Sequence, residues 1–334
     1  METVILLLQF SLLLLSACSY NKSIETERIT MEPTIVYDSI ESRMPGTLMV
    51  CNEFVIWTDP LTSEDQAHIV NLKTQEEIGK IVNVGNGPKE FITPAFSLST
   101  DNELIVYDMN NDKMAIYAID DVKKGQEPSC SIFNKKTKGL TRLIKINNDD
   151  FISFDPQSSF PFQTANSHSF GKYPFGNEID NNYNVSQGNI AYNPDKNILI
   201  YSTISFPYMA AYKKEKDKFE LLWEQKGDLD YSISENKIVL DKKKKGSVEL
   251  ALTKDYIVTL QRDYQTDPTN EAKVGRDFTK LPQTLFLYDY KSNLRKIVDL
   301  DMPVLRIAAD IKNNAVYAIV VNPDFMIVKC ELPD

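Results

Sequence analysis

Chemistry is indicated most clearly at a cysteine near the N-terminus. Leu15-Ser16-Ala17-Cys18 has the form of a lipobox: a branched residue, two small residues that fit a peptidase pocket, and a cysteine whose thiol can receive lipid. It directly follows an almost wholly apolar run, Val4 to Ala17. At about 14 residues, this run matches a signal-peptide core and is shorter than the ~20 residues of a membrane-spanning helix. We therefore predict that residues 1–17 are a signal peptide and that Cys18 is lipidated.

Two alternatives to this prediction stay open: the apolar run is a core segment of the folded domain, or the product is secreted without lipid. One feature departs from the signal-peptide pattern, because Met1-Glu2-Thr3 carries no Lys or Arg, which indicates a misassigned start codon or a weaker signal. Residues 18–30 are polar and are interpreted as a lipidated tether. Ser19 follows the cysteine where an Asp would indicate retention in the inner membrane, so the outer membrane is favoured.

Residues suited to metal or hydrolytic chemistry are sparse. The chain has two histidines, His68 and His168, and neither has a partner at metal-ligand spacing. The patterns HExxH, GxSxG and DxDxDG, which mark zinc proteases, serine hydrolases and calcium loops, are absent from the sequence. We therefore predict no metal, no cofactor and no catalytic residue.

Aromatic residues in an irregular middle stretch are the candidates for ligand recognition. Between residues 151 and 212, Phe and Tyr are interleaved with Pro, Asn and Ser. Flat apolar faces beside amides and hydroxyls can hold a sugar ring or a peptide. The candidate ligand-binding residues are Phe160, Phe162, Tyr173, Phe175 and Tyr183. For each ring taken singly, the alternative is packing between sheets.

A glycine-rich segment, Gly85 to Phe91, is predicted to be a structural turn. Gly85 and Gly87 can adopt positive φ without steric cost, Pro88 fixes the next φ, and Glu90 can accept backbone N–H bonds. A phosphate-binding role is disfavoured because no helix N-terminus follows and the Lys-Ser/Thr pair of a P-loop is missing.

The composition limits the expected partners. The formal net charge of −10 repels phosphate backbones, so nucleic acid is not expected. The basic run Lys242–Lys245 is interpreted as a solvated loop. With Cys18 committed to lipid, Cys51, Cys130 and Cys330 cannot all pair, and their spacing fits neither a disulfide framework nor a zinc site. Buried thiols are predicted at Cys51 and Cys330.

The elements that must position these residues are β-strands. Short runs rich in Tyr, Phe, Ile and Val alternate with turn residues, and no stretch of 12 or more residues has a convincing helical period. Because the chain has only 12 glycines, Asn and Asp must supply many turns, as in Asn110-Asn111-Asp112. Hairpins are predicted over residues 104–119, 285–300 and 315–331.

The strand groups recur at intervals of about 40 to 60 residues, which predicts a six-bladed β-propeller of four-stranded antiparallel blades over residues 31–334. The approximate blades are 44–91, 92–138, 139–182, 183–245, 246–302 and 303–334. The last group is short, and residues 28–41 are expected to complete it by pairing across the ring, which removes two free sheet edges. A pair of β-sandwiches is the structural alternative.

The lipobox, the repeat count, Gly85-Asn86-Gly87-Pro88-Lys89-Glu90-Phe91 and the later Gly171-Lys172-Tyr173-Pro174 together resemble the TolB-like six-bladed β-propeller lipoproteins of bacteria. The likeness covers nearly the whole mature chain, and the first of the two glycine segments is its distinctive part. The resemblance implies a fold and a location, and it carries over no catalytic residues.

We therefore predict a lipid-anchored protein of the bacterial cell envelope that binds a glycan, a peptide or an envelope protein without catalysis, and whose mature chain has no transmembrane helix. The alternative is an envelope enzyme that acts on polysaccharide through carboxylates near the propeller channel. That alternative stays open because two carboxylates can come from distant positions and need only the right separation in space.

Overall fold

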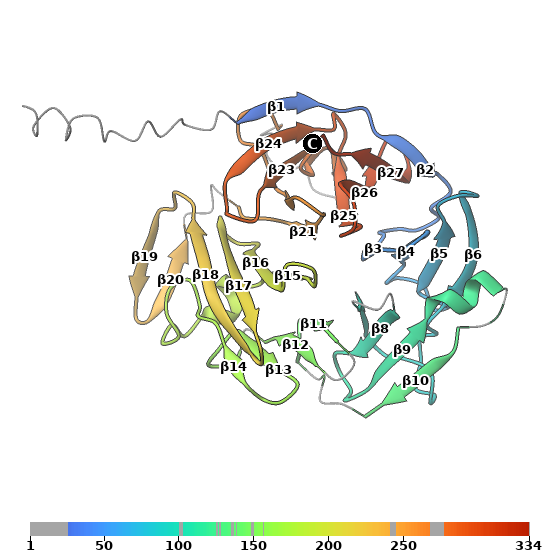
Figure 1. Cartoon of the computed structure of the whole chain (residues 1–334), viewed down its shortest axis with the longest axis horizontal. Coiled ribbons are helices and arrows are strands. Elements are labelled where there is room, and N and C mark those ends of the chain that lie inside the picture. The colour runs from blue at the N-terminus through green and yellow to red at the C-terminus, as the bar shows by residue number, and fades with distance from the viewer. Residues whose placement is uncertain are drawn as a thin grey trace, which may run out of the picture.

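The computed structural model describes residues 26–99, 103–124, 126, 128–134, 137, 139–147, 150–155, 157–240, 245–267 and 277–333. The predicted signal peptide (residues 1–17) and the predicted lipidation site Cys18 lie outside the described residues. Over the described ones, strands form six antiparallel sheets that stand as blades around a ring (Figure 1). The predicted six-bladed β-propeller is confirmed, and, apart from the two N-terminal strands that join blades 5 and 6, the strands of each blade fall within the range expected for it.

The first three blades follow the chain in order from their inner to their outer strand. Blade 1 consists of β3 (Leu48–Cys51), β4 (Phe54–Thr58), β5 (Ala67–Asn71) and β6 (Glu76–Ile81). Blade 2 consists of β7 (Pro94–Leu98), β8 (Glu103–Asp108), β9 (Met114–Ala118) and β10 (Cys130–Phe133), with the 3-10 helix η1 (Ile119–Lys124) before its last strand. Blade 3 consists of β11 (Arg142–Lys145), β12 (Phe151–Phe154), β13 (Phe162–Thr164) and β14 (Ser169–Phe170).

The next two blades carry the insertions of the fold. Blade 4 consists of β15 (Gly188–Asn193), β16 (Ile198–Thr203), β17 (Tyr208–Glu215) and β18 (Lys218–Lys226), and the short helix α2 (Asn182–Val185) precedes it. A separate hairpin follows, made of β19 (Tyr231–Ser234) and β20 (Lys237–Leu240). Blade 5 consists of β21 (Glu249–Leu252), β22 (Ile257–Leu260), β23 (Thr284–Tyr288) and β24 (Leu294–Asp299), and the 3-10 helix η2 (Phe278–Lys280) lies between β22 and β23.

Blade 6 closes the ring with a strand from the N-terminal segment. It consists of β25 (Val304–Ala309), β26 (Ala315–Val321), β27 (Phe325–Glu331) and β2 (Thr34–Tyr37), which pairs antiparallel with β27. The expected pairing of residues 28–41 across the ring is therefore confirmed for β2. The strand β1 (Glu27–Thr30) differs, because it pairs in parallel with β24 as a fifth strand of blade 5. Residues 27–30 thus belong to a sheet, whereas the sequence alone suggests a polar tether there.

Each pair of adjacent blades shares a hydrophobic cluster. Blades 4 and 5, for example, meet through Ile200 and Met209 on one side and Leu252 and Ile257 on the other. Clusters of the same kind join the other five pairs around the ring. Strands whose faces both touch a neighbouring blade are buried throughout, as in β3, β4 and β16, which explains their nearly continuous apolar sequences.

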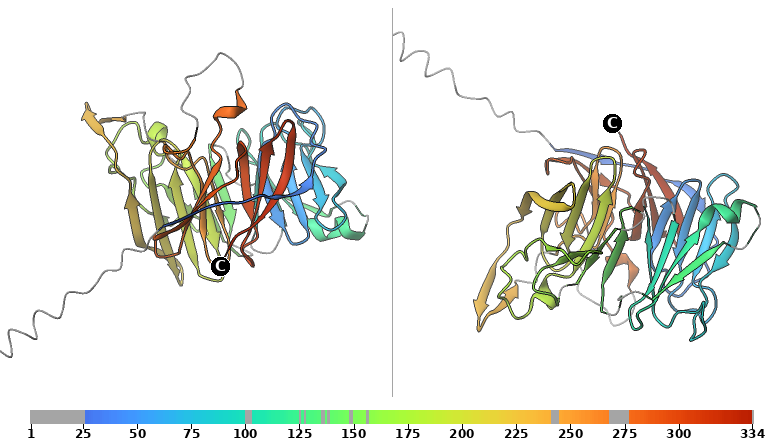
Figure 2. Two further views of the ribbon diagram at one scale, coloured as in Figure 1. Left: turned by 90° about the horizontal axis from the view of Figure 1, so that it is seen from above. Right: turned by 60° about the horizontal axis from the view of Figure 1, so that its bottom comes forward.

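Strand direction places the long connections on one face of the ring. Neighbouring strands run antiparallel, so the starts of the innermost strands share a face with the ends of the second and fourth strands. We call it the loop face. The β19–β20 hairpin and η2 belong to connections on this face, and Figure 2 shows both rising from the same side of the ring.

Among the residues that the structure describes, Cys51, Cys130 and Cys330 form no disulfide bond: Cys51 and Cys330 are buried, as predicted, and Cys130 is half-buried on β10. In the described part of the chain, no helix is both long and apolar enough to cross a bilayer.

Candidate functional site

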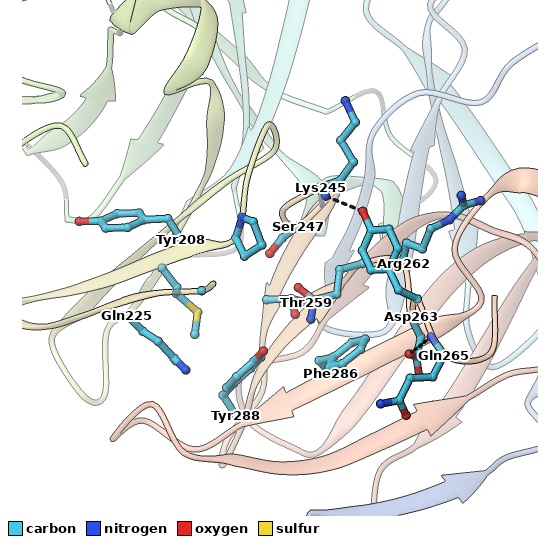
Figure 3. A pocket seen from close by; sticks show the side chains of 15 residues that line it. Tyr208, Gln225, Lys245, Ser247, Thr259, Arg262, Asp263, Gln265, Phe286 and Tyr288 are labelled. Carbon is cyan, nitrogen blue, oxygen red and sulfur yellow. Dashed lines mark hydrogen bonds between the residues drawn. The ribbon is translucent and has the colours of Figure 1, made fainter. Parts of the chain in front are cut away.

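A pocket of about 310 Å³ opens between blades 4 and 5 on the loop face (Figure 3). It begins where the apolar contact between the two blades ends, at Met209. Tyr208 and Gln225 line it from blade 4, and Phe286 and Tyr288 line it from blade 5. The remaining lining residues are Pro207, Gly227, Lys245, Ser247, Thr259, Gln261, Arg262, Asp263, Tyr264 and Gln265. The volume lies at the lower end of the range for small-ligand sites, about 300 to 1,000 Å³.

The turn that follows β22 forms one wall of the pocket. The backbone N–H of Asp263 donates to a carboxylate oxygen of Asp267 at 3.0 Å, and the N–H of Gln265 donates to the carboxylate of Asp263 at 2.9 Å. The hydroxyl of Thr284 on β23 donates to Asp267 at 3.2 Å. Both aspartates are buried, so these bonds satisfy carboxylates that water does not reach. The wall therefore has a defined shape without regular secondary structure.

The N-terminal strand β1 holds the same turn from outside. A guanidinium nitrogen of Arg28 lies 2.6 Å from Oδ2 of Asp263. Burial alone would raise the pKa of Asp263, but the N–H of Gln265 and the Arg28 guanidinium hold it below its ordinary value. Asp263 is therefore ionised and paired with Arg28, although it borders the pocket.

The blade 4 wall is positioned by a second ionic group. Tyr208 donates its hydroxyl proton to Glu224 at 2.9 Å, and Lys172 binds the other oxygen of Glu224 at 2.8 Å. Burial opposes ionisation of Glu224, but the bonds from Lys172 and Tyr208 lower its pKa. Burial also raises the pKa of Tyr208, which therefore stays protonated and keeps its ring oriented along the wall.

Inside the pocket, hydrogen-bonding groups stand beside aromatic faces. Burial raises the pKa of Tyr288, whose hydroxyl also bonds with the side chain of Gln261. The Thr259 hydroxyl is buried and has no hydrogen-bond partner among the described residues. Such a group costs free energy unless a ligand or water bonds to it. The side chains that line the pocket can therefore stack on a flat ring and bond to several hydroxyl or amide groups of a ligand.

The candidate residues from the aromatic stretch do not line this pocket. Phe162 lies in the core with a fully covered ring, and its ring centroid is 5.3 Å from that of Tyr201. Tyr173 is buried too, and its hydroxyl donates to the carbonyl of Ser158 at 2.7 Å. Both rings therefore serve packing in this structure, which is the alternative that the sequence leaves open.

The other three candidates are spread over the loop face and its surroundings. Phe160 and Tyr183 are each 43% exposed and lie apart from the pocket lining. Phe175 is half-buried, and its ring lies 4.9 Å from that of Tyr231 on β19. The Nζ of Lys226 sits 3.9 Å from the Phe175 ring, and burial lowers the pKa of this lysine. Phe175 therefore anchors the hairpin.

The glycine segment forms a closed turn between blades 1 and 2. The N–H of Gly87 donates to the Glu90 carboxylate at 2.7 Å, and that of Gly85 donates to the Phe91 carbonyl at 3.1 Å. The ammonium of Lys113 donates to the carbonyls of Gly87 and Glu90. A Cβ on Gly85 would come within 2.1 Å of a Glu90 carboxylate oxygen, so a side chain there would displace this bond. The turn from Gly85 to Phe91, which includes Pro88, thus bonds its own backbone groups together with Glu90 and Lys113.

Polar residues from four blades gather where the innermost strands begin. A guanidinium nitrogen of Arg142 donates to the side-chain oxygen of Asn189 at 3.0 Å, and Arg306 lies 3.4 Å from Glu249. Burial raises the pKa of Glu249, and the charges of Arg306 and Arg142 oppose that rise. The charges that act on Glu249 are thus those of two arginines from other blades.

The histidines take structural positions. Nδ1 of His68 lies 2.8 Å from a carboxylate oxygen of Glu77, and its ring stacks on Trp57 at 3.8 Å between centroids. His168 lies in the turn that precedes β14, where its N–H donates to the hydroxyl of Thr164 at 3.3 Å. Within the described ranges, no group of three or more His, Cys, Asp or Glu side chains is placed to hold a metal ion.

Comparisons with known proteins agree with the architecture. No family model matches the chain, and no curated relative matches its sequence. A Bacteroides fragilis protein described as exported has a similar structure, with a TM-score of 0.58 at 11% identity over 91% of this chain and 98% of that chain. The β-propeller domain of Cps50 (Swd1) from Myceliophteria thermophila gives a TM-score of 0.46 at 11% identity, over 89% and 99% of the two chains. Likeness at this identity shows the fold alone.

Proposed function

We propose that this chain is a lipid-anchored envelope protein of the TolB-like propeller type that binds a sugar-containing ligand, without turnover, in the pocket between blades 4 and 5. The observation that carries the binding role is the pocket itself, because Tyr and Phe faces there stand beside three glutamine side chains and a buried hydroxyl without a partner. Sugar recognition uses this combination of flat apolar faces and hydrogen-bonding groups.

The location is supported by the N-terminal sequence. The lipobox ends at Cys18, and the described sheet begins with β1 at residue 27, so a short polar stretch separates the predicted lipid from the propeller. The similar Bacteroides fragilis protein is described as exported. Removing the lipid acceptor tests the anchor: Cys18→Ser should move the protein from the membrane fraction to the soluble fraction. Membrane retention of that variant would contradict the anchor.

The binding role is tested by a thermal-shift screen of soluble residues 22–334 against glycans and peptides, followed by product analysis of each hit. Stabilisation without product supports the proposal, whereas released sugar supports the enzyme alternative. The double variant Gln225→Ala, Gln261→Ala should lose the ligand-induced shift. Gln163→Ala is the matched control, because Gln163 is exposed on β13 of blade 3, outside the pocket. If the double variant keeps the full shift, the ligand binds elsewhere.

A further inference from the structure

We infer that the ligand of this pocket is an N-acetylated amino sugar, whose acetamido group enters the covered floor of the pocket and accepts a hydrogen bond from Thr259. The inference rests on the proposed function, since it names the ligand class for the same pocket. It is carried by the way in which the exposure and the chemistry of the lining residues change together between the opening of the pocket and its floor.

The floor of the pocket consists of three lining residues that are almost fully covered. Met209, Ser247 and Thr259 are 6%, 5% and 2% exposed, respectively. Met209 comes from blade 4, Thr259 from blade 5, and Ser247 from the segment that joins the two blades. These side chains offer a thioether and two hydroxyls, and none of them is charged. A substituent that reaches the floor should therefore be small, uncharged and in part apolar.

Two further lining residues, Tyr208 and Asp263, are covered, but their polar groups are already bonded. The Tyr208 hydroxyl donates to Glu224 at 2.9 Å, and the Asp263 carboxylate is held by Arg28 at 2.6 Å. The hydroxyl of Thr259, by contrast, has no partner among the described residues, although its oxygen is covered. A ligand atom that accepts a hydrogen bond from Thr259 would relieve the cost of this unpaired group.

The opening of the pocket is lined by rings and amides that water still reaches. Phe286, Tyr288 and Gln261 are half-buried, and Gln225 is exposed. Aromatic rings can stack on the apolar face of a pyranose, and amide groups can bond to its hydroxyls. A pyranose ring therefore fits at the opening, and a substituent on that ring is the part of the ligand that reaches the floor.

The register of blade 5 brings the floor next to the opening. Thr259 on β22 lies directly opposite Phe286 on β23, so the two side chains stand on the same face of the sheet, with Cβ atoms about 4.5 to 5.5 Å apart. Ile257, two residues earlier on β22, packs against blade 4, so Thr259 faces blade 4 as well. Figure 3 shows Thr259 and Phe286 close together in the lining. A group carried by a sugar that stacks on Phe286 can thus meet the Thr259 hydroxyl.

An acetamido group matches this floor in both of its parts. Its carbonyl oxygen can accept a hydrogen bond from Thr259, and its methyl group can pack against Met209. A sugar hydroxyl at the same position can form the hydrogen bond but brings no apolar group to Met209. An ammonium or a carboxylate would place a charge on a floor without a group of opposite charge, which costs free energy.

The experiment is calorimetric titration of the full chain, purified in detergent, with three probes that differ only at position 2 of each sugar: triacetylchitotriose (acetamido), chitotriose (amine) and cellotriose (hydroxyl). Triacetylchitotriose should bind about tenfold or more tightly than cellotriose, since one neutral hydrogen bond and one buried methyl group together give about that factor. The methyl glycosides of N-acetylgalactosamine and galactose repeat the comparison on a second sugar and should show the same order.

Thr259→Val keeps the shape of the side chain and removes its hydroxyl. It should weaken the binding of triacetylchitotriose about threefold or more and leave that of cellotriose nearly unchanged. Ser202→Ala is the matched control, because it removes a buried hydroxyl without a partner outside the pocket lining, and it should keep the full preference. Ser247→Val, which narrows the floor, should also weaken the acetylated probe more than cellotriose. Circular dichroism checks that each variant is folded.

Equal binding of the acetylated and hydroxyl probes, or tightest binding of chitotriose, would overturn the inference and leave the proposed function standing. If no acetylated probe binds, the inference is wrong, and the glycan screen decides separately whether the pocket binds another sugar. If Thr259→Val and Ser247→Val both fold and both keep the wild-type preference, the acetamido group does not lie on this floor.

Discussion

Among the side chains that the structure describes, two buried hydroxyls have no hydrogen-bond partner, and only one of them lines the pocket. Thr259 lines the pocket, and Ser202 lies in blade 4 outside it. Each hydroxyl has given up water without gaining a protein partner, which costs about 1 to 3 kcal/mol. If the pocket binds hydroxyl groups, Thr259 recovers part of this cost in the complex, whereas Ser202 does not.

Thr259→Val is accordingly expected to raise the free energy of unfolding by about 1 kcal/mol while weakening the binding of sugar. Ser202→Ala should raise stability to a similar degree with no effect on binding. Chemical denaturation measures the first quantity and titration the second. Loss of stability in Thr259→Val would show that its hydroxyl has a partner, such as an ordered water.

Arg28→Ala tests how β1 holds the pocket wall. The variant leaves the buried carboxylate of Asp263 without its cation and should cost about 1 to 2 kcal/mol, a value reduced because Arg28 is partly exposed. Glu27→Ala is the control, since Glu27 is exposed and lies 3.8 Å from Lys296, and it should cost less than about 0.5 kcal/mol.

The same pair predicts a dependence on pH. The pKa of Asp263 is lower in the folded chain than in the unfolded one, so its contribution to stability is present above the unfolded pKa of about 3.9. That contribution is lost as the pH falls through the folded pKa. Unfolding of Arg28→Ala should therefore depend less steeply on pH below about 4 than unfolding of the wild type. Parallel curves for the two proteins would contradict this assignment.

At the scale of elements, close approach of strands explains one glycine. Gly188 begins β15, and a Cβ there would lie 2.2 Å from the Ser202 carbonyl oxygen and 2.7 Å from the Tyr201 ring. Backbone atoms of a paired strand cannot give way easily. Gly79 in β6 differs, because a Cβ there would meet its nearest neighbour at 4.0 Å.

We expect Gly188→Ala to destabilise the protein by about 2 kcal/mol or more, through overpacking between β15 and β16. Gly79→Ala should change stability by less than about 1 kcal/mol, since the site has room and alanine restricts the unfolded chain. Thermal unfolding of the two variants gives the comparison. Equal melting temperatures would show that β15 can shift away from β16.

At the scale of the whole molecule, ring closure depends on residues 27–37. The strand β2 covers the edge of β27 and buries Val36, while β1 covers the edge of β24. One segment thus joins the last two blades, whose strands come from the far end of the chain (Figure 1). Two sheet edges that would otherwise be open are paired.

Two truncations separate the roles of these strands. A chain that starts at residue 32 lacks β1 alone and should unfold in one cooperative transition at a melting temperature lowered by several degrees. A chain that starts at residue 39 also lacks β2, and it should lose about 3 kcal/mol or more, because the buried Val36 and the β27 ladder go with it. Calorimetry distinguishes the two. Equal stability would mean that closure does not depend on β2.

The number of blades and most strands follow from the sequence alone. The strands β8, β26 and β27 are rich in β-branched and aromatic residues and are flanked by Asn and Asp turns, so the sequence predicts them. They occur where predicted. Closure by the N-terminal segment could also be predicted, because the last group of strands is one short of a blade. These features depend on residues that are close together in the sequence, so they can be predicted from local residue types.

The pocket could not be found in this way. Its lining runs from Pro207 to Tyr288 with long gaps, and its turn is held by Arg28, 235 positions before Asp263. The sequence favours a dense aromatic stretch instead, yet Phe162 and Tyr173 are buried there. An aromatic residue looks the same in sequence whether it faces a ligand or a neighbouring blade. Only the packing of blades 4 and 5 leaves a space between them, because their shared apolar cluster ends at Met209 and polar residues continue beyond it.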